Sequence, residues 1–332
     1  AVARVNARTA AAETPRTAEP RSLTEHPRTH LALAMLNAMH GDLLDDLDSP
    51  LTLTMALRHT RRDVSLNREA LAATYPHAAG TLVVFLHGLA ENDDSWAYRA
   101  QERFGDAGTT YGTLLEHDLG VTALYVRYNT GLRISANGAL LAELLGRLRD
   151  AWPAPVEQIV LVGHSMGGLV IHSALFVDDP WAELVSHTIT LGAPHLGAPL
   201  EQAVTRLAHG VPRSATLRVM RQILRGRSAG IKDLRHGNLV HADWHGHDPD
   251  DPSNRRVAVR PHPAPRHHAI VSTVTKDPGH AVGAVLGDLM VLPHSAGGLE
   301  TPDDQICRIG GLHHLDLLNH PSVYAQILTW LR

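Results

Sequence analysis

The sequence contains a single cysteine and no long run of apolar residues. Because Cys307 is the only thiol in 332 residues, an intramolecular disulfide is excluded, and the redox state of the compartment stays open. No apolar stretch approaches the roughly 18 residues that a membrane-spanning helix needs. We therefore expect a soluble protein without a transmembrane segment, which is either cytoplasmic or secreted after removal of a leader. Neither localisation nor oligomeric state follows from the sequence.

An excess of positive charge is also lacking. Thirty Lys and Arg residues face 34 Asp and Glu residues, which gives a net charge of −4 with the histidines neutral. This balance provides no overall attraction to polyanions, so we do not expect nucleic acid as a partner. Histidine, in contrast, is abundant at 24 residues, and many of these must titrate at the surface between about pH 5 and 8.

The length and the composition fit one large α/β domain with an insertion. With 44% hydrophobic residues, the chain can bury a sizeable core. Residues 1–27 are rich in Ala, Thr, Arg, Glu and Pro and show no apolar periodicity, which is typical of a flexible tail or the remnant of a processed leader. We expect the folded domain to cover residues 28–332.

Strand-like and helix-like segments alternate along this domain, which predicts a mainly parallel sheet with right-handed crossovers. The apolar patterns predict strands at 51–57, 82–86, 121–126, 158–162, 187–191, 268–275 and 305–309. They predict helices at 30–47, around 140–148 with Ser135 or Asn137 as the N-cap, at 169–177 and at 321–331.

The pattern changes in residues 200–264. Helical segments interrupted by turns lead into a stretch that is dense in His, Asp, Pro and Arg and has no strand pattern. An insertion of this size between two sheet strands predicts a cap or lid that controls access of water and substrate. The alternative is a disordered polar loop.

A serine flanked by glycines follows one of the predicted strands. Residues 163–168 read Gly-His-Ser-Met-Gly-Gly and come directly after the strand at 158–162. A serine nucleophile must project from a turn so tight that the flanking positions tolerate almost no side chain, and Gly163 and Gly167 meet this requirement. The motif predicts Ser165 as the nucleophile of a serine hydrolase. The alternative is an ordinary strand-to-helix turn with a small polar residue.

A second glycine-containing turn, His87-Gly88-Leu89, ends the strand at 82–86. An oxyanion hole requires two backbone N–H groups aimed at the developing negative charge, each worth about 3–4 kcal/mol. Met166, which follows the serine, is expected to supply one, and Leu89 the other, with Ala90 as the alternative. We expect the side chain of His87 to pack or brace the loop rather than to carry a proton.

A serine hydroxyl also needs a histidine that takes its proton and an acid that orients the histidine. The loop after the last predicted strand contains the adjacent His313 and His314, both of which are candidates. Asp288 lies in a loop after the strand that begins at His268, where an acid belongs at the carboxyl end of the sheet. Three further aspartates are rivals, because loop aspartates also form turns and cap helices: Asp277, Asp303 and Asp304.

These motifs resemble the α/β-hydrolase superfamily of serine esterases and lipases. Within it, the sequence is similar to a bacterial lipase-like group related to the catalytic domain of GPI inositol deacylase. The resemblance covers the chain from about residue 30 to the C-terminus. Besides the motifs already described, it rests on the blocks 127–132, 191–197, 227–234 and 314–321. His294 and the histidine-rich segment 236–268 depart from the group's pattern.

The resemblance implies the α/β-hydrolase fold with an inserted lid, and ester hydrolysis through an acyl-enzyme. The histidine that opens the group's His-x-Asp-Leu-Leu block is catalytic, which corresponds to His314, and the aspartate of its Gly-Asp-x-x-Val block corresponds to Asp288. The implied substrate is a small-molecule or lipid-like ester, or a polyester, and no cofactor is expected. We expect Arg127 and Asn129 either to brace the nucleophile loop or to form a buried hydrogen-bonded pair.

Three alternatives remain from the sequence. The same catalytic groups would serve a thioesterase, a lactonase or an acyltransferase, because substrate choice depends on the pocket and the lid. An α/β-hydrolase fold can also act as a binding module without catalysis. Finally, a cluster of His and Asp residues could hold zinc, although its spacing matches no strong zinc motif: His241, Asp243, His245, His247 and Asp248.

Overall fold

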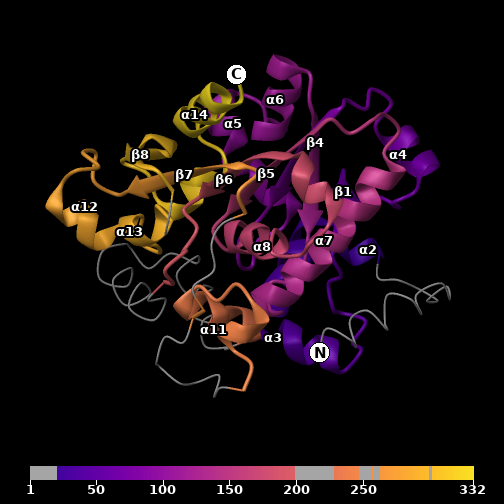
Figure 1. Cartoon of the computed structure of the whole chain (residues 1–332), viewed down its shortest axis with the longest axis horizontal. Coiled ribbons are helices and arrows are strands. Elements are labelled where there is room, and N and C mark those ends of the chain that lie inside the picture. The colour runs from indigo at the N-terminus through magenta and orange to yellow at the C-terminus, as the bar shows by residue number, and fades with distance from the viewer. Residues whose placement is uncertain (1–20, 199–227, 247–255, 258–261, 299–300) are drawn as a thin grey trace.

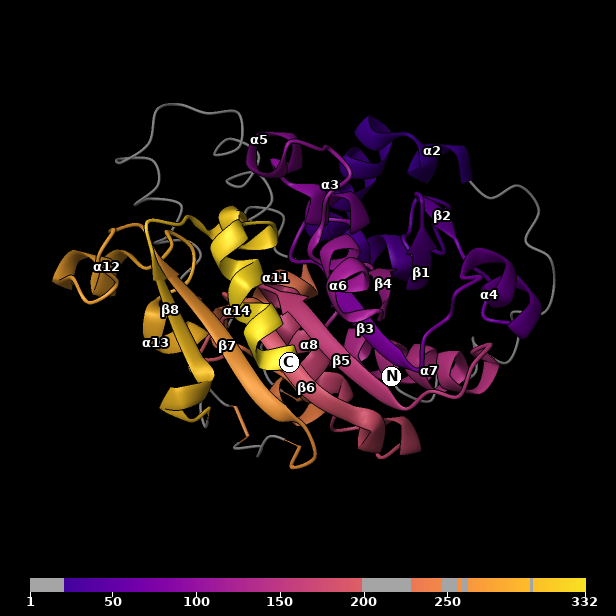
Figure 2. The ribbon, with the colours of Figure 1, turned by 90° about the horizontal axis from the view of Figure 1, so that it is seen from above.

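The chain is built around one mainly parallel β-sheet flanked by helices (Figure 1). The computed structural model describes residues 21–198, 228–246, 256–257, 262–298 and 301–332. In these residues the sheet has eight strands in the order β2-β1-β4-β3-β5-β6-β7-β8, which Figure 2 shows from right to left. The strands are β1 (Ala56–His59), β2 (Arg62–Asp63), β3 (Thr81–Leu86), β4 (Thr122–Arg127), β5 (Gln158–His164), β6 (Val185–Leu191), β7 (Arg266–Thr273) and β8 (Ile306–Gly310).

Strands β3 to β8 pair in parallel, whereas β1 runs antiparallel to β4 and β2. This arrangement confirms the predicted α/β-hydrolase fold class. Because parallel strands end at the same edge of a sheet, the loops that follow β3, β5, β7 and β8 meet at the carboxyl edge. All the predicted site residues lie in or next to these four loops.

Helices cover both faces of the sheet. The α-helices are α2 (Arg21–Glu25), α3 (Pro27–Asp46), α4 (Arg68–Thr74), α5 (Ala100–Phe104), α6 (Tyr111–Leu119), α7 (Ile134–Ala151), α8 (Met166–Ala174), α11 (Ala229–His236), α12 (Ala281–Leu286), α13 (Pro293–Ala296) and α14 (Pro321–Leu331). Short 3-10 helices are η1 (Asp93–Ala97), η2 (Pro180–Leu184), η3 (His241–Asp243), η4 (Asp303–Gln305) and η5 (His314–Leu318). Helices α3, α7, α8 and α11 pack on one face, and α6 and α14 on the other.

Strand β3 is apolar from Leu82 to Leu86 because both of its faces are covered. In β3, Leu82, Val84 and Leu86 face the α7 and α8 side, whereas Val83 and Phe85 face the α6 and α14 side. All five side chains are fully buried. Such continuous apolar runs are typical of parallel strands buried on both faces. The runs at 82–86 and 158–162 therefore predicted the two strands that carry the candidate site.

Strand β1, which lies between β2 and β4, differs from the prediction. It begins at Ala56 and ends at His59, rather than covering residues 51–57. The strand therefore includes Arg58, whose guanidinium is buried and forms ion pairs with Asp63 and Asp93. A buried arginine that is paired with residues elsewhere in the chain interrupts the apolar pattern of a strand. The predicted strand therefore began and ended too early in the sequence.

Two helices also differ from the prediction: α2 was not predicted, and α7 begins earlier than predicted. Helix α2 lies inside the segment predicted as a flexible tail, whose residues 1–20 lie outside the described residues. Helix α7 begins at Ile134, before both predicted caps. The carboxylate of Asp233 accepts a hydrogen bond from the Ile134 N–H at 2.9 Å, so the cap comes from a residue 99 positions away.

The predicted lid at 200–264 lies between β6 and β7 and falls largely outside the described residues. Its described elements are α11 and η3, and α11 packs against the main domain (Figure 1). Among the helices that the structure describes, none is long and apolar enough to cross a membrane.

Candidate active site

Ser165 occupies a strained turn between β5 and α8. Its backbone has φ 52° and ψ −120°, a conformation that L-residues rarely adopt and that costs on the order of 1–3 kcal/mol. The N–H of Ser165 donates to the carbonyl of Leu191 at 2.9 Å, which ties the turn to the end of β6. The residue stands at the N-cap of α8, with 7% of its surface exposed. A nucleophile elbow requires a strained strand-to-helix turn of this kind.

Both glycines of the motif are required by close backbone contacts. A Cβ atom on Gly163 would lie 2.5 Å from the backbone nitrogen of Gly168. A Cβ atom on Gly167 would clash with the carbonyl of Leu86 and lie 2.7 Å from the carbonyl oxygen of His87. Strand β5, helix α8 and the end of β3 therefore approach so closely that no side chain fits at either position.

The predicted histidine and the predicted acid lie in direct contact. The Nδ1 atom of His314 lies 2.7 Å from Oδ2 of Asp288, and both side chains are buried. The carboxylate acts only as an acceptor, so Nδ1 carries the proton and Nε2 has a free lone pair. His313 is exposed, and its main-chain N–H donates to the carboxylate of Asp316. Of the two candidate histidines, only His314 contacts Asp288.

Burial and the neighbouring charge act in opposite directions on His314. Burial disfavours the imidazolium, but the carboxylate of Asp288, its hydrogen bond and the more distant Glu91 together hold the pKa of His314 above its ordinary value. The Nε2 atom is buried and makes no hydrogen bond with any residue that the structure describes. The ring therefore has one atom available to take a proton from another group at the site.

The loop that carries Asp288 is shaped for this contact. Oδ1 accepts hydrogen bonds from the N–H groups of Met290 at 3.0 Å and Val291 at 2.8 Å. Burial opposes ionisation, but His314 and these two N–H donors hold the pKa of Asp288 below its ordinary value. Gly287 has φ 57°, and a Cβ atom there would collide with the carbonyl of Val291. The Gly-Asp-x-x-Val spacing follows from this turn.

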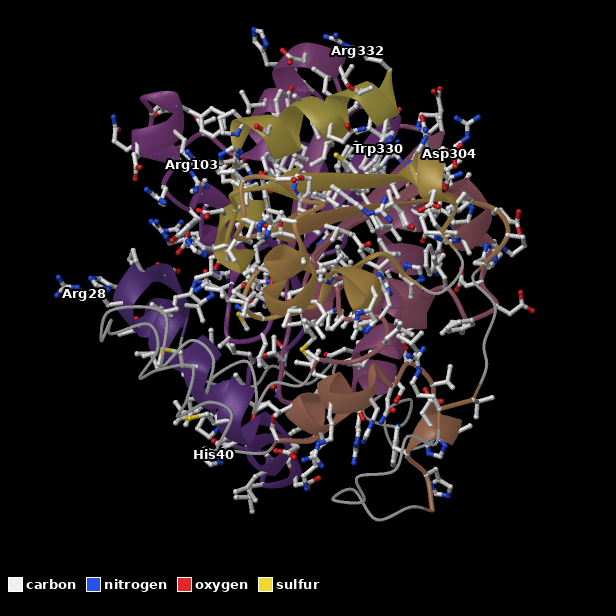
Figure 3. The ribbon with its side chains drawn as sticks, turned by 90° about the vertical axis from the view of Figure 1, so that its left-hand side faces the viewer. Arg28, His40, Arg103, Asp304, Trp330 and Arg332 are labelled. Carbon is white, nitrogen blue, oxygen red and sulfur yellow. The ribbon has the colours of Figure 1, made fainter. Side chains whose placement is uncertain are left out.

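The loop of His314 is held by Arg103 of α5. The guanidinium of Arg103, labelled in Figure 3, binds the carboxylate of Asp316 and donates to the carbonyl of Asn319 at 2.7 Å. Asp316 in turn accepts the N–H of His313 at 2.9 Å. The aspartate of the His-x-Asp-Leu-Leu block thus anchors the loop that places His314.

The candidate oxyanion loop follows β3. Ala90 has φ 62°, and its N–H is directed at the hydroxyl of Thr130 at 3.3 Å. Among the described residues, no hydrogen bond involves the N–H of Leu89 or that of Met166, the first residue of α8. This difference favours Leu89 over Ala90 as the partner of Met166.

Three residues near these loops have structural contacts. His87 is fully buried, stacks on Tyr128 at 4.5 Å between ring centroids, and has its pKa lowered by burial to about 4. Arg127 binds Asp63 on β2, and Asn129 donates to the carbonyl of Gly41 at 3.0 Å. Arg127 and Asn129 therefore fasten β2 and α3 to the sheet, and the structure gives neither a hydrogen bond to the nucleophile loop.

Sequence reasoning missed a buried acid–base contact at this site. Glu91 lies 2.9 Å from Nδ1 of His164, the residue before the nucleophile. His164 lies within the Gly-His-Ser-Met-Gly-Gly motif, and Glu91 follows the His87-Gly88-Leu89 turn. Nothing in the sequence, however, indicates that these two residues, 73 positions apart, are in contact. A glutamate three residues after Gly88, in an otherwise buried turn, was the only available signal.

The described part of the chain contains no group of three or more His, Cys, Asp or Glu residues that could hold a metal ion. In the suggested zinc cluster, His241 stacks on His245, while Asp243 accepts backbone N–H groups of Leu239 and Val240. Asp243 therefore organises a turn. The remaining two members, His247 and Asp248, lie outside the described residues.

Helix α11, which belongs to the predicted lid, packs next to the candidate site. Gly230 of this helix lies so close to Met166 that a Cβ atom on Gly230 would be 3.0 Å from Cε of Met166. The buried carboxylate of Asp233 binds Arg133 at 2.7 Å and Asn238 at 3.1 Å. This part of the insertion is fixed against the main domain next to the candidate oxyanion hole.

Comparisons with known proteins agree with this architecture. The mature form of the Bacillus licheniformis lipase BlEst2 superimposes with a TM-score of 0.50 at 19% identity, over 75% of this chain and 91% of that one. Aspergillus fumigatus lipase B gives a TM-score of 0.45 at 14% identity, over 80% of this chain and 57% of that one. At 19% identity the likeness to BlEst2 shows the fold alone. None of the curated proteins compared with the sequence matches it.

A protein-family model provides the more specific result. The model described as "PGAP1-like alpha/beta domain" matches residues 77–260, which is more than half of the chain. The matched region contains β3 to β6, the nucleophile elbow and the candidate oxyanion loop. The chain belongs to the family of PGAP1-like alpha/beta domains.

Proposed function

We propose that the chain is a serine carboxylic-ester hydrolase that acts through an acyl-enzyme on Ser165. The observation that carries the proposal is the buried contact between His314 and Asp288 at the edge of the sheet where the strained elbow presents Ser165. Nucleophile, base and acid follow one another along the chain in the order that α/β-hydrolases use. The lipases among the proteins of similar fold are consistent with this chemistry.

The proposed reaction begins with attack of Ser165 Oγ on the ester carbonyl carbon. The hydroxyl proton passes to Nε2 of His314, and the N–H groups of Leu89 and Met166 receive the oxyanion. When the tetrahedral intermediate collapses, the C–O bond to the alcohol breaks and the alkoxide takes the proton from His314. The acyl group then remains bound to the serine.

Water completes the cycle by the same route. It gives one proton to His314 Nε2 while its oxygen attacks the acyl carbon, and the bond to Ser165 Oγ then breaks as the proton returns to the serine. Asp288 keeps its negative charge throughout and stabilises the imidazolium of His314. No cofactor takes part in this scheme.

We further propose that residues 28–332 form one domain whose insertion at 200–264 selects the substrate. Support comes from the position of the insertion between β6 and β7 and from the packing of α11 next to Met166. A small-molecule ester, a lipid-like ester and a polyester all require the same catalytic groups, so chain-length preference depends on this segment.

Two measurements test the proposal. A fluorophosphonate should label the wild-type protein, and Ser165→Ala should abolish both the labelling and the activity on p-nitrophenyl esters. A series from acetate to palmitate, with matched thioesters and lactones, then identifies the acyl derivative and the chain length. Ser322→Ala is a suitable control because Ser322 is an exposed residue of α14. A wild type inactive on every ester would overturn the proposal.

A further inference from the structure

His164 is a fully buried imidazole held between two oxygen acceptors. Its Nε2 atom lies 3.1 Å from the backbone carbonyl oxygen of His314, and its Nδ1 atom lies 2.9 Å from Oε2 of Glu91. His164 is the last residue of β5 and directly precedes Ser165. Neither ring nitrogen is accounted for by the reaction proposed above.

The two contacts determine where the protons lie. A carbonyl oxygen only accepts hydrogen bonds, so Nε2 of His164 must carry a proton. Oε2 of Glu91 also accepts the N–H of Gly88 at 2.6 Å, which favours a carboxylate. Burial opposes this charge, but His164 and the Gly88 N–H hold the pKa of Glu91 below its ordinary value. With Glu91 as a carboxylate, each ring nitrogen of His164 faces an acceptor, so the geometry of the contact is that of an imidazolium–carboxylate pair.

The pair joins three loops of the candidate site. Glu91 fixes the turn after β3, in which Leu89 is the candidate oxyanion donor. His164 ends β5 next to Ser165, and its Nε2–H reaches the main chain of His314, at the start of η5. The rings of His164 and His314 lie 4.7 Å apart between centroids. One pair, of which His164 is fully buried and Glu91 mostly buried, therefore contacts the loops of the proposed nucleophile, oxyanion hole and base.

We propose that Glu91 and His164 are positioning residues, which hold the His314 main chain and the oxyanion loop in place beside the nucleophile elbow. Their opposite charges also cancel each other's effect on the ring of His314. The inference rests on the proposed function because His314 is taken as the general base. It adds a buried charge pair to the site, in which neither member touches the substrate.

The charges predict that the pKa of His314 changes when one member of the pair is removed but not when both are removed. His314 faces the carboxylates of Asp288 and Glu91 and the ring of His164. Glu91 additionally faces His87, which is neutral in the working range because burial lowers its pKa to about 4. Removing only the cation leaves the Glu91 carboxylate without its partner, and this carboxylate then favours the protonated form of His314.

The variants His164→Gln, Glu91→Gln and the double variant separate these effects. A glutamine at 164 keeps a donor that can reach the carbonyl of His314 but carries no charge. A glutamine at 91 can accept the Gly88 N–H and donate to Nδ1 of a neutral His164. The exposed His117–Asp118 pair, at 2.7 Å, provides the control variant Asp118→Asn.

The pH dependence of kcat/KM on p-nitrophenyl acetate is the main readout. In His164→Gln we expect kcat to fall about tenfold with KM within about threefold of wild type, and the acid limb to move up by about one pH unit. In the double variant the acid limb should return to within about 0.3 units of wild type, because both charges are gone. Acid limbs that stay in place in every variant, or one that stays raised in the double variant, would overturn the proposal.

A second measurement does not depend on turnover or on the stability of a His164 variant. The ¹⁵N spectrum of the wild type at pH 7.5 should contain a histidine with both ring nitrogens protonated, and in Glu91→Gln that ring should lose one proton. Asp118→Asn should leave this signal unchanged. A wild type without such a ring would overturn the pair even if the esterase is active. If no ester is hydrolysed, the proposed function fails while this spectrum still decides the charge state.

Discussion

The Nδ1 atom of His314 lies 2.7 Å from Oδ2 of Asp288, a residue 26 positions earlier in the chain. The other carboxylate oxygen is occupied by two backbone N–H groups, so the acid is fixed on both sides. The contact therefore determines both the orientation of the ring and which of its nitrogens carries the proton. That proton position is open to a direct test.

Asp288→Asn should reduce kcat on p-nitrophenyl esters about 10³–10⁴-fold. The amide oxygen can still accept the N–H groups of Met290 and Val291, which turns the NH₂ group toward His314. Nδ1 must then accept, the proton moves to Nε2, and the ring can no longer take the proton of Ser165. Asp277→Asn is the matched control, because Asp277 lies in an exposed turn. A loss below about tenfold in Asp288→Asn would show that Asp288 does not set the tautomer.

The pH profile of kcat/KM should have an acid limb above the ordinary histidine pKa of about 6.5. The base form of His314 is needed, and the neighbouring carboxylates hold its pKa above the ordinary value in spite of burial. Activity should therefore decline as the pH falls through this raised pKa. In Asp288→Asn the residual activity should decline at a lower pH. An acid limb below pH 6 in the wild type would contradict this account.

The oxyanion loop provides a third test through Thr130, whose hydroxyl accepts the Ala90 N–H at 3.3 Å. Thr130→Val removes this acceptor, so the turn that aims the Leu89 N–H loses its brace. We expect kcat to fall about tenfold with little change in KM, because the oxyanion forms only in the transition state. Thr130→Ser keeps the hydroxyl and should retain most of the activity. Equal activity in the two variants would argue against this brace.

The nucleophile turn was predictable because its requirements are local. Gly163 and Gly167 report a close approach of backbone segments, and a strand and a helix flank them in sequence. Asp288 and His314 could be placed because each follows a strand of the parallel sheet. The central strands and helix α14 were predictable for a related reason, since burial on both faces or on one helix face leaves a periodic pattern.

The remaining features depend on partners that are distant in sequence. The buried Arg58 in β1, the cap of α7 by Asp233 and the Glu91–His164 pair each join residues that only the folded chain brings together. A charged residue with a distant partner looks like a surface residue in the sequence. For this reason the early strand and the start of α7 were misplaced, and the pair beside the site was missed.

Gly167→Ala should distort the elbow as well as destabilise the fold. The added Cβ atom would meet the carbonyls of Leu86, at the end of β3, and of His87, which are main-chain atoms and cannot rotate away. We expect a loss of about 1–3 kcal/mol in the free energy of unfolding and a loss of fluorophosphonate labelling. Gly108→Ala, where only a flexible aspartate lies within 4 Å, should change neither. Full labelling of Gly167→Ala would contradict the close approach.

The free energy of unfolding should decrease as the pH falls from about 6.5 to about 4. Burial lowers the pKa of His87, His195 and His268 to about 4, and these rings gain a proton more readily in the unfolded chain. Unfolding therefore takes up protons in this window: the three rings add no protonation term above about pH 6.5, and they destabilise the folded state increasingly as the pH falls toward about 4. Urea unfolding at a series of pH values measures the slope.

His268→Phe tests this assignment at one residue. The ring of His268 stacks on Trp330 of α14, labelled in Figure 3, at 4.4 Å between centroids, and its nitrogens bind no described residue. Phenylalanine keeps the stacking and cannot take up a proton, so the free energy of unfolding should depend less steeply on pH between 6.5 and 4. His117→Gln, at an exposed site, should leave the slope unchanged. An unchanged slope in His268→Phe would mean that the ring is protonated in the folded protein, and that its burial against Trp330 contributes nothing to acid sensitivity.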